Sequence, residues 1–329
     1  MKKDCTPACF ECQYLDFDSR CAEIYDPTAP LHFSEPGQLN AMFERILTDT
    51  ELAKYNPRAV RQPHTSSATD ATTCTNGEDA TNENNCAASL APDGPWIVLL
   101  DDFLTPIECD TLIQLGTDRG YEQSTNVGAR QYDGSYAGVE STDRTSHNTW
   151  CVEECWNHKV VQDIHKRLEY LTGVPSINYE YLQLLRYEEG QFYGRHHDFI
   201  EHHIDRAPGP RALTVFMYLN DVEAGGGTHF TDVNVTVKPK RGSIVIWPSV
   251  LDEEPMKMDE RTHHTAQPVE AGIKFGTSAM RFLGRGVCVK RCVGTTSLTT
   301  SFLYIMPCTG ANAWIHQRDF KTAWKMECH

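Results

Sequence analysis

The sequence predicts an α+β protein whose core is a β-sandwich or jelly roll, with supporting helices packed on one sheet. Two helical segments lie between residues 105 and 173, and β-branched and aromatic segments separated by Gly, Pro and Asp follow them. Helices followed by a block of strands are typical of this architecture. Hydrophobic residues make up 40% of the 329 residues, which indicates a packed core.

Composition divides the chain into three parts. Residues 1–62 form an extension that combines a cluster of cysteines with one amphipathic helix, predicted over residues 37–49. Residues 63–94 are polar and rich in Ser, Thr, Asn and Asp, which is typical of a loop or linker. Residues 95–329 are denser in hydrophobic segments, so we expect them to form the principal domain.

The first elements of this domain have clear signals. The apolar segment PWIVLLDDFL, residues 95–104, predicts a buried strand. A helix follows, because Thr105 can cap its N-terminus, Pro106 suits the first turn and Glu108 can complete a capping box. The domain is therefore expected to begin with a strand that leads directly into a helix.

A second helix, ending at Gly173, precedes the block of strands. Its apolar spacing places four residues on one face, namely Val160, Ile164, Leu168 and Leu171. The strands predicted after it are EYLQLLRY, RALTVFMYLND, VNVTVKP and GSIVIWPS.

The charge and hydropathy of the chain exclude some classes of protein. The formal net charge of −15 argues against general nucleic-acid binding, which needs a basic surface, although it allows a basic peptide substrate. No stretch approaches the roughly 18 to 20 apolar residues of a membrane span. The N-terminus also lacks the apolar core of a signal peptide.

Thirteen cysteines are many for a reducing compartment. Their spacing predicts disulfides formed in an oxidising lumen, with zinc binding by the first four as the alternative. If the lumen is correct, a targeting segment is missing from the start of this sequence. The cysteines that cluster are Cys5, Cys9, Cys12 and Cys21, then Cys74 with Cys86, and Cys151 with Cys155.

Two adjacent histidines precede an acid in RYEEGQFYGRHHDFI, residues 186–200. Alternate residues of a strand face the same way, so His196 can share a face with Asp198, whereas His197 would pair only with Phe199. One more histidine would complete the two-histidine, one-carboxylate set that suits non-haem Fe(II). Spacing alone does not select it from the candidates His202, His203, His229, His263, His264 and His316.

The neighbouring segments form an extended set of motifs. YEEGQFYGRHHDF has the pattern Y-x-x-G-Q-x-Y-x-x-H-x-D, and HTAQPVEAGIK has the pattern H-x-x-x-P-V-x-x-G-x-K. RALTVFMYLND, GGGTHF, PKRGSIVIWPS and DRTSHNTW add a strand, a glycine turn, a K-x-G-x-x-x-x-W element and an R-T-S segment. Together they resemble the prolyl 4-hydroxylase family of Fe(II)- and 2-oxoglutarate-dependent dioxygenases. The resemblance covers roughly residues 95–275 and resumes at 311, and it implies a double-stranded β-helix in a dioxygenase domain spanning 95–329.

The resemblance also implies roles for individual residues. His196, Asp198 and His264 correspond to the iron ligands. Lys274, ten residues after His264, corresponds to the cation that binds the distal carboxylate of 2-oxoglutarate, for which a buried ammonium is suited. Tyr187 corresponds to a tyrosine that contacts the same co-substrate. Positions near the family's peptide-binding groove are matched by Tyr193, Arg144, Arg211 and Trp247.

The implied reaction is hydroxylation of peptidyl proline to 4-hydroxyproline, coupled to decarboxylation of 2-oxoglutarate to succinate and CO2. It requires Fe(II) and O2, and we expect L-ascorbate as the reductant. The expected partner is a proline-containing peptide or protein in the endoplasmic reticulum lumen, and no motif indicates an obligate partner subunit. Two alternatives stay open: a 2-oxoglutarate oxygenase acting on another residue or a small substrate, and a non-catalytic binder of proline-rich peptides.

Other polar residues have simpler interpretations. The histidines His197, His202, His203 and His263 are expected to be solvated or to neighbour the ligands without being ligands. Asn234 begins a glycosylation sequon, but it falls in the predicted strand VNVTVKP beside the core.

Residues 276–310 interrupt the resemblance, because the family would run directly from GIKF into a segment such as ANAWIHQRDF, which resumes at Ala311. The interruption holds three cysteines and no acidic residue, in a chain otherwise rich in acid. Our hypothesis is translated non-coding sequence such as a retained intron, and a real surface loop is the alternative. In either case it cuts the core just after Lys274. Its basic residues are Arg281, Arg285, Lys290 and Arg291.

Overall fold

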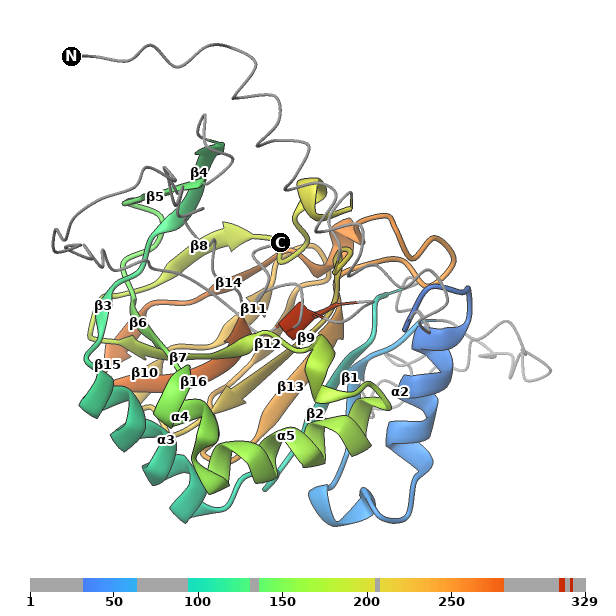
Figure 1. The fold of residues 1–329 in the computed structure, drawn as a ribbon, viewed down its shortest axis with the longest axis horizontal. Coiled ribbons are helices and arrows are strands. Elements are labelled where there is room, and N and C mark those ends of the chain that lie inside the picture. Colours follow the sequence, from blue (N-terminus) through green and yellow to red (C-terminus); the bar gives the residue numbers. More distant parts are fainter. Residues whose placement is uncertain are drawn as a thin grey trace, which may run out of the picture.

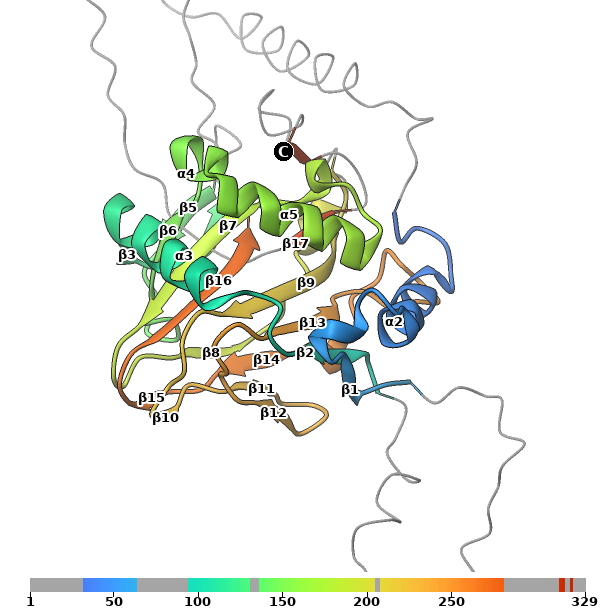
Figure 2. The ribbon, with the colours of Figure 1, turned by 90° about the horizontal axis from the view of Figure 1, so that it is seen from below.

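The computed structural model describes residues 32–63, 94–130, 136–204, 208–280, 314–316 and 320–321. Two antiparallel sheets face each other, and three helices cover the outer face of the larger sheet (Figure 1, Figure 2). This is the predicted jelly roll with helices on one sheet. The covering helices are α3 (Pro106–Arg119), α4 (Glu153–Asn157) and α5 (Lys159–Thr172).

The larger sheet has nine strands in the order β1-β2-β13-β9-β16-β7-β6-β3, with β17 also pairing with β9. Its central strands are almost entirely buried, since one face meets the helices and the other meets the smaller sheet. The strands are β1 (Arg58–Arg61), β2 (Ile97–Leu100), β3 (Glu122–Gln123), β6 (His147–Trp150), β7 (Tyr181–Tyr187), β9 (Arg211–Tyr218), β13 (Ile244–Pro248), β16 (Lys274–Met280) and β17 (Trp314–His316).

The smaller sheet has the order β12-β11-β14-β8, and it carries two of the predicted iron ligands. Two short two-stranded sheets lie outside both of these. The smaller sheet contains β8 (Tyr193–His196), β11 (Thr228–Phe230), β12 (Val235–Val237) and β14 (His264–Ala266). The two-stranded sheets are β4 (Asn126–Arg130) with β5 (Tyr136–Val139), and β10 (Ala224–Gly225) with β15 (Val269–Ala271). The 3-10 turns are η1 (Ala53–Tyr55), η3 (Ser176–Asn178), η4 (Glu201–His203) and η5 (Glu260–Thr262).

The two predicted helices and their caps are confirmed, except that one valine predicted for the buried face of α5 is only partly buried. The Thr105 hydroxyl accepts a hydrogen bond from the Glu108 amide, and the Glu108 carboxylate accepts one from the Thr105 amide, which completes the capping box. Helix α5 ends at Gly173, whose φ of 73° is the left-handed conformation that glycine adopts readily. On α5 the fully buried valine is Val161, whereas Val160, which the apolar spacing predicts for the buried face, is only partly covered.

Helix α2 (Gln38–Thr48) confirms the helix expected in the N-terminal part, and it packs into the main hydrophobic core. Phe43 stacks on Trp96 with ring centroids 5.4 Å apart. The Asp252 carboxylate accepts hydrogen bonds from the first backbone amides of α2, at 2.9 Å from Leu39, and so replaces a local cap. The helix is therefore held to a loop more than 200 residues away in the chain. The predicted linker lies outside the described residues except at its two ends.

Only part of the cysteine prediction falls on described residues. Cys151 and Cys155 form a disulfide at the junction between β6 and α4, and Cys109 is a buried free thiol. The other cysteines named above, Cys5, Cys9, Cys12, Cys21, Cys74 and Cys86, lie outside the described residues.

Strand β9 pairs with two separate segments along one edge. Ser278 of β16 lies opposite Phe216, and Trp314 of β17 lies opposite Thr214. Phe216 and Thr214 are two positions apart on β9, so a single continuous partner strand would need its two opposing residues to be two positions apart as well. Ser278 and Trp314 are instead 36 positions apart, which leaves 34 residues in excess. This excess agrees to within one residue with the interruption predicted at 276–310.

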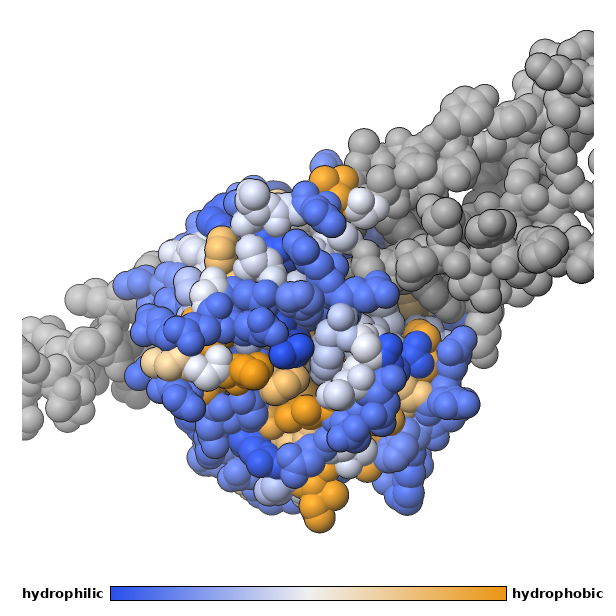
Figure 3. All heavy atoms as spheres, turned by 90° about the vertical axis from the view of Figure 1, so that its left-hand side faces the viewer, coloured by the Kyte–Doolittle hydropathy of each residue, from blue (hydrophilic) through white to orange (hydrophobic). Residues whose placement is uncertain are grey.

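The outer surface beside β3 and β15 is mostly hydrophilic, with a band of hydrophobic residues across its middle (Figure 3). Among the described residues, no helix has both the length and the apolar character that crossing a membrane requires.

Candidate active site

The three predicted iron ligands meet between the two sheets. His196 ends β8 and lies directly opposite His264, the first residue of β14, so the pairing of the two strands places both imidazoles side by side. Asp198 follows β8 in the loop, and its carboxylate oxygens lie 3.9 Å from the Nε2 of His196 and 3.8 Å from the Nε2 of His264. One ligand atom from each residue lies within 4.8 Å of the others. The arrangement fits a small metal ion held on one face.

Backbone carbonyls orient both imidazoles. The Nδ1 of His196 lies 2.8 Å from the Gly194 carbonyl oxygen, and the Nδ1 of His264 lies 3.0 Å from that of Thr262. Each Nδ1–H donates to its carbonyl, so each Nε2 keeps a free lone pair and lies within 3.9 Å of an Asp198 carboxylate oxygen. The Nε2 of His196 is buried and has no hydrogen-bond partner within the described part of the chain. Such an orphaned acceptor fits a metal ligand.

The local environment favours the protonation state in which His196 and Asp198 can each bind a metal. Burial, followed by the neighbouring His264, lowers the pKa of His196 well below its ordinary value, so this imidazole is neutral. Burial alone would raise the pKa of Asp198, but the positive charge of His264 or His196, when either is protonated, and a hydrogen bond from the Thr214 hydroxyl (2.7 Å) lower it; the Thr214 bond acts whether or not the imidazoles are charged. A neutral imidazole and an ionised carboxylate are the forms that bind a metal.

Aromatic rings pack against both histidines. The Tyr193 ring stacks on His196 with centroids 3.6 Å apart, and the Trp247 ring meets His264 edge-on at 4.9 Å. The Arg144 guanidinium lies over the far side of Tyr193, 4.6 Å from its centroid. These contacts restrict rotation of the imidazoles and keep their Nε2 atoms on the same side.

A pocket opens beside the triad and ends at Lys274, whose side chain is fully buried. The Lys274 ammonium is 5.0 Å from the Tyr187 ring centroid and has no hydrogen-bond partner within the described residues. Burial lowers the pKa of Lys274 from 10.5 to about 7. A buried cation without a counter-charge is suited to binding a carboxylate from a ligand. The pocket is lined by Tyr187, Tyr193, His196, Asp198, Thr214, Phe216, Thr228, Trp247, His264, Ala266 and Lys274.

Two neighbours shape the Lys274 end of this pocket. Tyr187 lies opposite Lys274 in the pairing of β7 with β16, and burial raises the pKa of its hydroxyl, which therefore remains a hydrogen-bond donor. Gly226 has a φ of 66°, and a Cβ atom there would come within 3.3 Å of the Lys274 side chain. The glycine turn noted in the sequence thus leaves room for the lysine.

The four residues predicted near the peptide groove fall in two groups. Tyr193 and Trp247 line the pocket. Arg144 is buried behind Tyr193 and donates to the Thr125 carbonyl at 3.3 Å. Arg211 is also buried, since its Nε donates to Glu180 at 2.9 Å and its NH1 to the Asp198 carbonyl at 3.4 Å. Contact with a peptide stays a prediction for all four residues.

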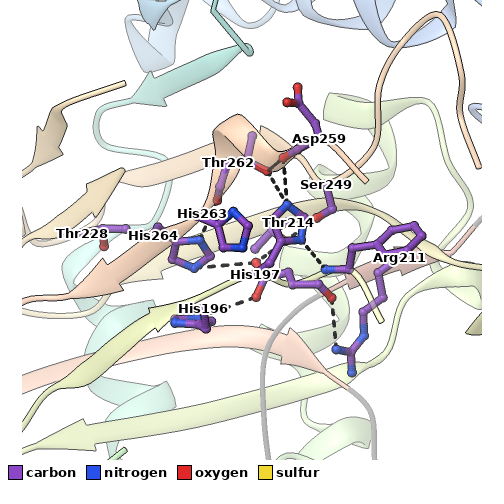
Figure 4. A network of polar contacts seen from close by, with 12 residues as sticks. His196, His197, Arg211, Thr214, Thr228, Ser249, Asp259, Thr262, His263 and His264 are labelled. Atoms are coloured by element: carbon purple, nitrogen blue, oxygen red, sulfur yellow. Dashed lines mark hydrogen bonds and ion pairs between the residues drawn. The ribbon is translucent and has the colours of Figure 1, made fainter. Parts of the chain in front are cut away.

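Sequence reasoning missed one neighbour of the metal site. Thr214 bonds the Asp198 carboxylate, and only the buried position of β9 behind the ligands reveals it. His197 neighbours the ligands without being one, which is one of the two outcomes expected from the sequence, but its partners were not foreseen: its Nε2 contacts Asp259 and Thr262 (Figure 4). No spacing rule would have identified either contact.

The other candidate histidines whose side chains are described do not join the triad. His229 bonds Thr236 within the β11–β12 hairpin, His263 bonds the Glu260 carbonyl, and His203 is buried in η4. The side chains of His202 and His316 lie outside the described residues.

The predicted position of Asn234 is wrong. It lies in the exposed turn between β11 and β12, with a φ of 51°, and the strand begins only at Val235. The alternation of VNVTVKP suggested a longer strand, but a left-handed residue at this position belongs to a turn.

A jelly roll that carries a two-histidine, one-carboxylate site beside a buried lysine defines a class of oxygenases, and residues 182–281 match the family described as the 2OG-Fe(II) oxygenase superfamily. Prolyl 4-hydroxylase 1 of Arabidopsis thaliana is 30% identical over 67% of this chain and 81% of its own length. Prolyl 4-hydroxylase subunit alpha-2 of Gallus gallus is 34% identical over 40% of this chain and 24% of its own.

Among solved structures, the viral collagen prolyl hydroxylase of Paramecium bursaria Chlorella virus-1, in its 2-oxoglutarate complex, is 28% identical, with a TM-score of 0.43 over 55% of this chain and 92% of that one. The chain belongs to the prolyl 4-hydroxylase family of Fe(II)- and 2-oxoglutarate-dependent dioxygenases. Its cofactors are accordingly Fe(II) and 2-oxoglutarate.

Proposed function

We propose that this protein hydroxylates peptidyl proline to 4-hydroxyproline and converts 2-oxoglutarate to succinate and CO2. One observation carries the proposal: the orphaned Nε2 of His196 and the unpaired ammonium of Lys274 face the same pocket. A metal would satisfy the first group and the distal carboxylate of a 2-oxo acid would satisfy the second. Family membership supplies proline as the substrate class.

Each residue then has a defined task. His196, Asp198 and His264 would hold Fe(II), which would supply the activation of O2. Lys274 pairs with the distal carboxylate of 2-oxoglutarate, and the Tyr187 hydroxyl donates to the same group. Binding that carboxylate raises the pKa of Lys274, so the ammonium stays charged in the complex.

A turnover experiment tests the proposal. The purified protein is incubated with Fe(II), 2-oxoglutarate, L-ascorbate and a panel of proline-rich peptides, and products are identified by mass spectrometry. We expect one added oxygen on proline, abolished by His196→Ala and retained by His229→Ala, because His229 bonds only within its hairpin. Consumption of 2-oxoglutarate without peptide oxidation would reject proline as the substrate. No consumption at all would favour the non-catalytic peptide binder.

We further propose that the protein works in the lumen of the endoplasmic reticulum and uses L-ascorbate as its reductant. Thirteen cysteines, with one disulfide among the described residues, support an oxidising compartment. The exposed turn position of Asn234 supports an accessible sequon there. Expression behind a secretory leader should give a glycosidase-sensitive mass increase that Asn234→Gln removes. An unmodified secreted protein would contradict the glycosylation of Asn234.

We also propose that residues 277–310 are an insertion into one strand and not a functional element. The support is the 34-residue excess in the pairing with β9. Gly276 directly precedes the segment and Gly310 is its last residue. Removing 276–309 or 277–310 therefore leaves the same sequence, KFGANAWIH. Sequencing of the transcripts tests whether the segment is a retained intron. A transcript population that always contains the segment would reject that hypothesis.

A further inference from the structure

One histidine beside the metal site has no part in the chemistry assigned above. His197 lies between the ligands His196 and Asp198 in the chain, but its side chain is directed away from the metal position toward η5 (Figure 4). Its contacts therefore concern how the ligands are held rather than the metal itself.

The hydrogen bonds of His197 define its tautomer. The backbone amide of Phe199 donates to its Nδ1 at 2.9 Å, so the ring proton must be on Nε2. That Nε2 lies 2.9 Å from the Asp259 carbonyl oxygen and 2.8 Å from the Thr262 hydroxyl oxygen. The Nε2–H therefore donates across to η5, while Nδ1 closes a local turn around Asp198.

The far end of this contact leads directly to the third ligand. The carbonyl of Thr262 accepts the Nδ1–H of His264, so a shift of Thr262 would turn that imidazole. The Thr262 hydroxyl also donates to the Asp259 carbonyl at 2.9 Å, and this bond closes the turn to which His197 is hydrogen-bonded. His197 is thus joined at one end to the segment of Asp198 and at the other to the segment of His264.

Strand pairing does not supply this connection. Strand β8 ends at His196 and β14 begins at His264, so the ladder stops at this pair and Asp198 lies beyond it. Thr214 and Arg211 bind Asp198, but both belong to β9 in the opposite sheet.

We propose that His197 is a positioning residue that sets the distance between Asp198 and the His264 imidazole by tying the loop after β8 to η5. The inference rests on the metal site and not on the substrate, so metal affinity tests it even if no peptide is hydroxylated.

Two amide substitutions separate the two ends of the imidazole. In His197→Gln the side-chain amide reaches the former Nε2 position and can still donate to η5. In His197→Asn the side-chain oxygen replaces Nδ1 and keeps the local turn, but nothing reaches η5. Mn(II) affinity of the metal-free proteins is measured by electron paramagnetic resonance of free Mn(II), and melting of the same samples is recorded.

We expect His197→Asn to weaken Mn(II) binding ~10- to 100-fold, the range typical of residues that orient ligands. His197→Gln should stay within about threefold of the wild type, as should the control His229→Asn. Thr262→Val removes the hydroxyl, one of the two oxygens that the His197 Nε2 contacts, and should also weaken Mn(II) binding, so the test does not depend on the folding of His197→Asn alone. Wild-type affinity in His197→Asn and Thr262→Val, or equal losses in the Gln and Asn variants, would overturn the proposal.

Discussion

Replacing Lys274 by Met should make the ligand-free protein more stable while it removes most of the affinity for 2-oxoglutarate. Lys274 is fully buried, and its ammonium has no hydrogen-bond partner within the described residues. Burial lowers its pKa to about 7. Met has a similar length and volume but no charge, so the substitution removes the buried cation without opening a large cavity.

The magnitude follows from the pKa. The change from 10.5 to about 7 corresponds to ~5 kcal/mol of destabilisation at pH 7 and below, since each pKa unit is worth about 1.4 kcal/mol. Between pH 7 and 10.5 the unfolded lysine is protonated and the folded one is neutral. The unfolded state then binds more protons, so this group makes stability rise with pH through that window.

Two assays measure the two effects. Melting without 2-oxoglutarate should show a transition ~10 °C higher for Lys274→Met than for the wild type near pH 7, and the difference should shrink toward pH 10. Succinate release should show a KM for 2-oxoglutarate raised ~150- to 5,000-fold, because removing one partner of a buried ion pair costs about 3–5 kcal/mol. Lys238→Met, at an exposed position, is the matched control and should change neither the melting temperature nor the KM for 2-oxoglutarate.

The reasoning would be refuted by a ligand-free Lys274→Met protein that melts at or below the wild-type temperature at pH 7. It would also be refuted by an unchanged KM for 2-oxoglutarate. A gain in stability with no change in KM would place the co-substrate carboxylate elsewhere in the pocket.

Three further substitutions or deletions follow from the structure. Deleting residues 277–310 should raise the melting temperature and the rate of 2-oxoglutarate turnover, since one strand can then pair along β9 without interruption; equal values for both forms would contradict the register argument. Thr214→Val removes the 2.7 Å hydrogen bond to the Asp198 carboxylate, a contact worth about 1.5–3 kcal/mol, and should weaken metal binding ~10- to 100-fold in a chelator competition. Arg211→Leu removes the buried ion pair between Arg211 and Glu180 and should lower the free energy of unfolding by about 3–5 kcal/mol, and the double change with Glu180→Leu should recover most of it in a denaturant titration.

Much of the secondary structure of this protein could be predicted from residues that are close together in the sequence. A cap, a first-turn proline and a terminal glycine depend on residues within a few positions, so the two main helices could be placed from the sequence. The same is true of the buried strands, whose runs of β-branched and aromatic residues are continuous. Family motifs then implied His196, Asp198, His264 and Lys274, whereas spacing alone left six histidines as the third ligand.

What the sequence could not provide are contacts between distant segments, since these depend on the path of the whole chain. The pairing of β8 with β14 is what brings His264 rather than His263 opposite His196. The burial of Lys274, whose ammonium has no hydrogen-bond partner in the described part of the chain, arises from strands β7, β9 and β16 closing around it. The bond from His197 to Thr262 spans 65 residues, and only tertiary structure, which brings two loops within 2.8 Å, creates it.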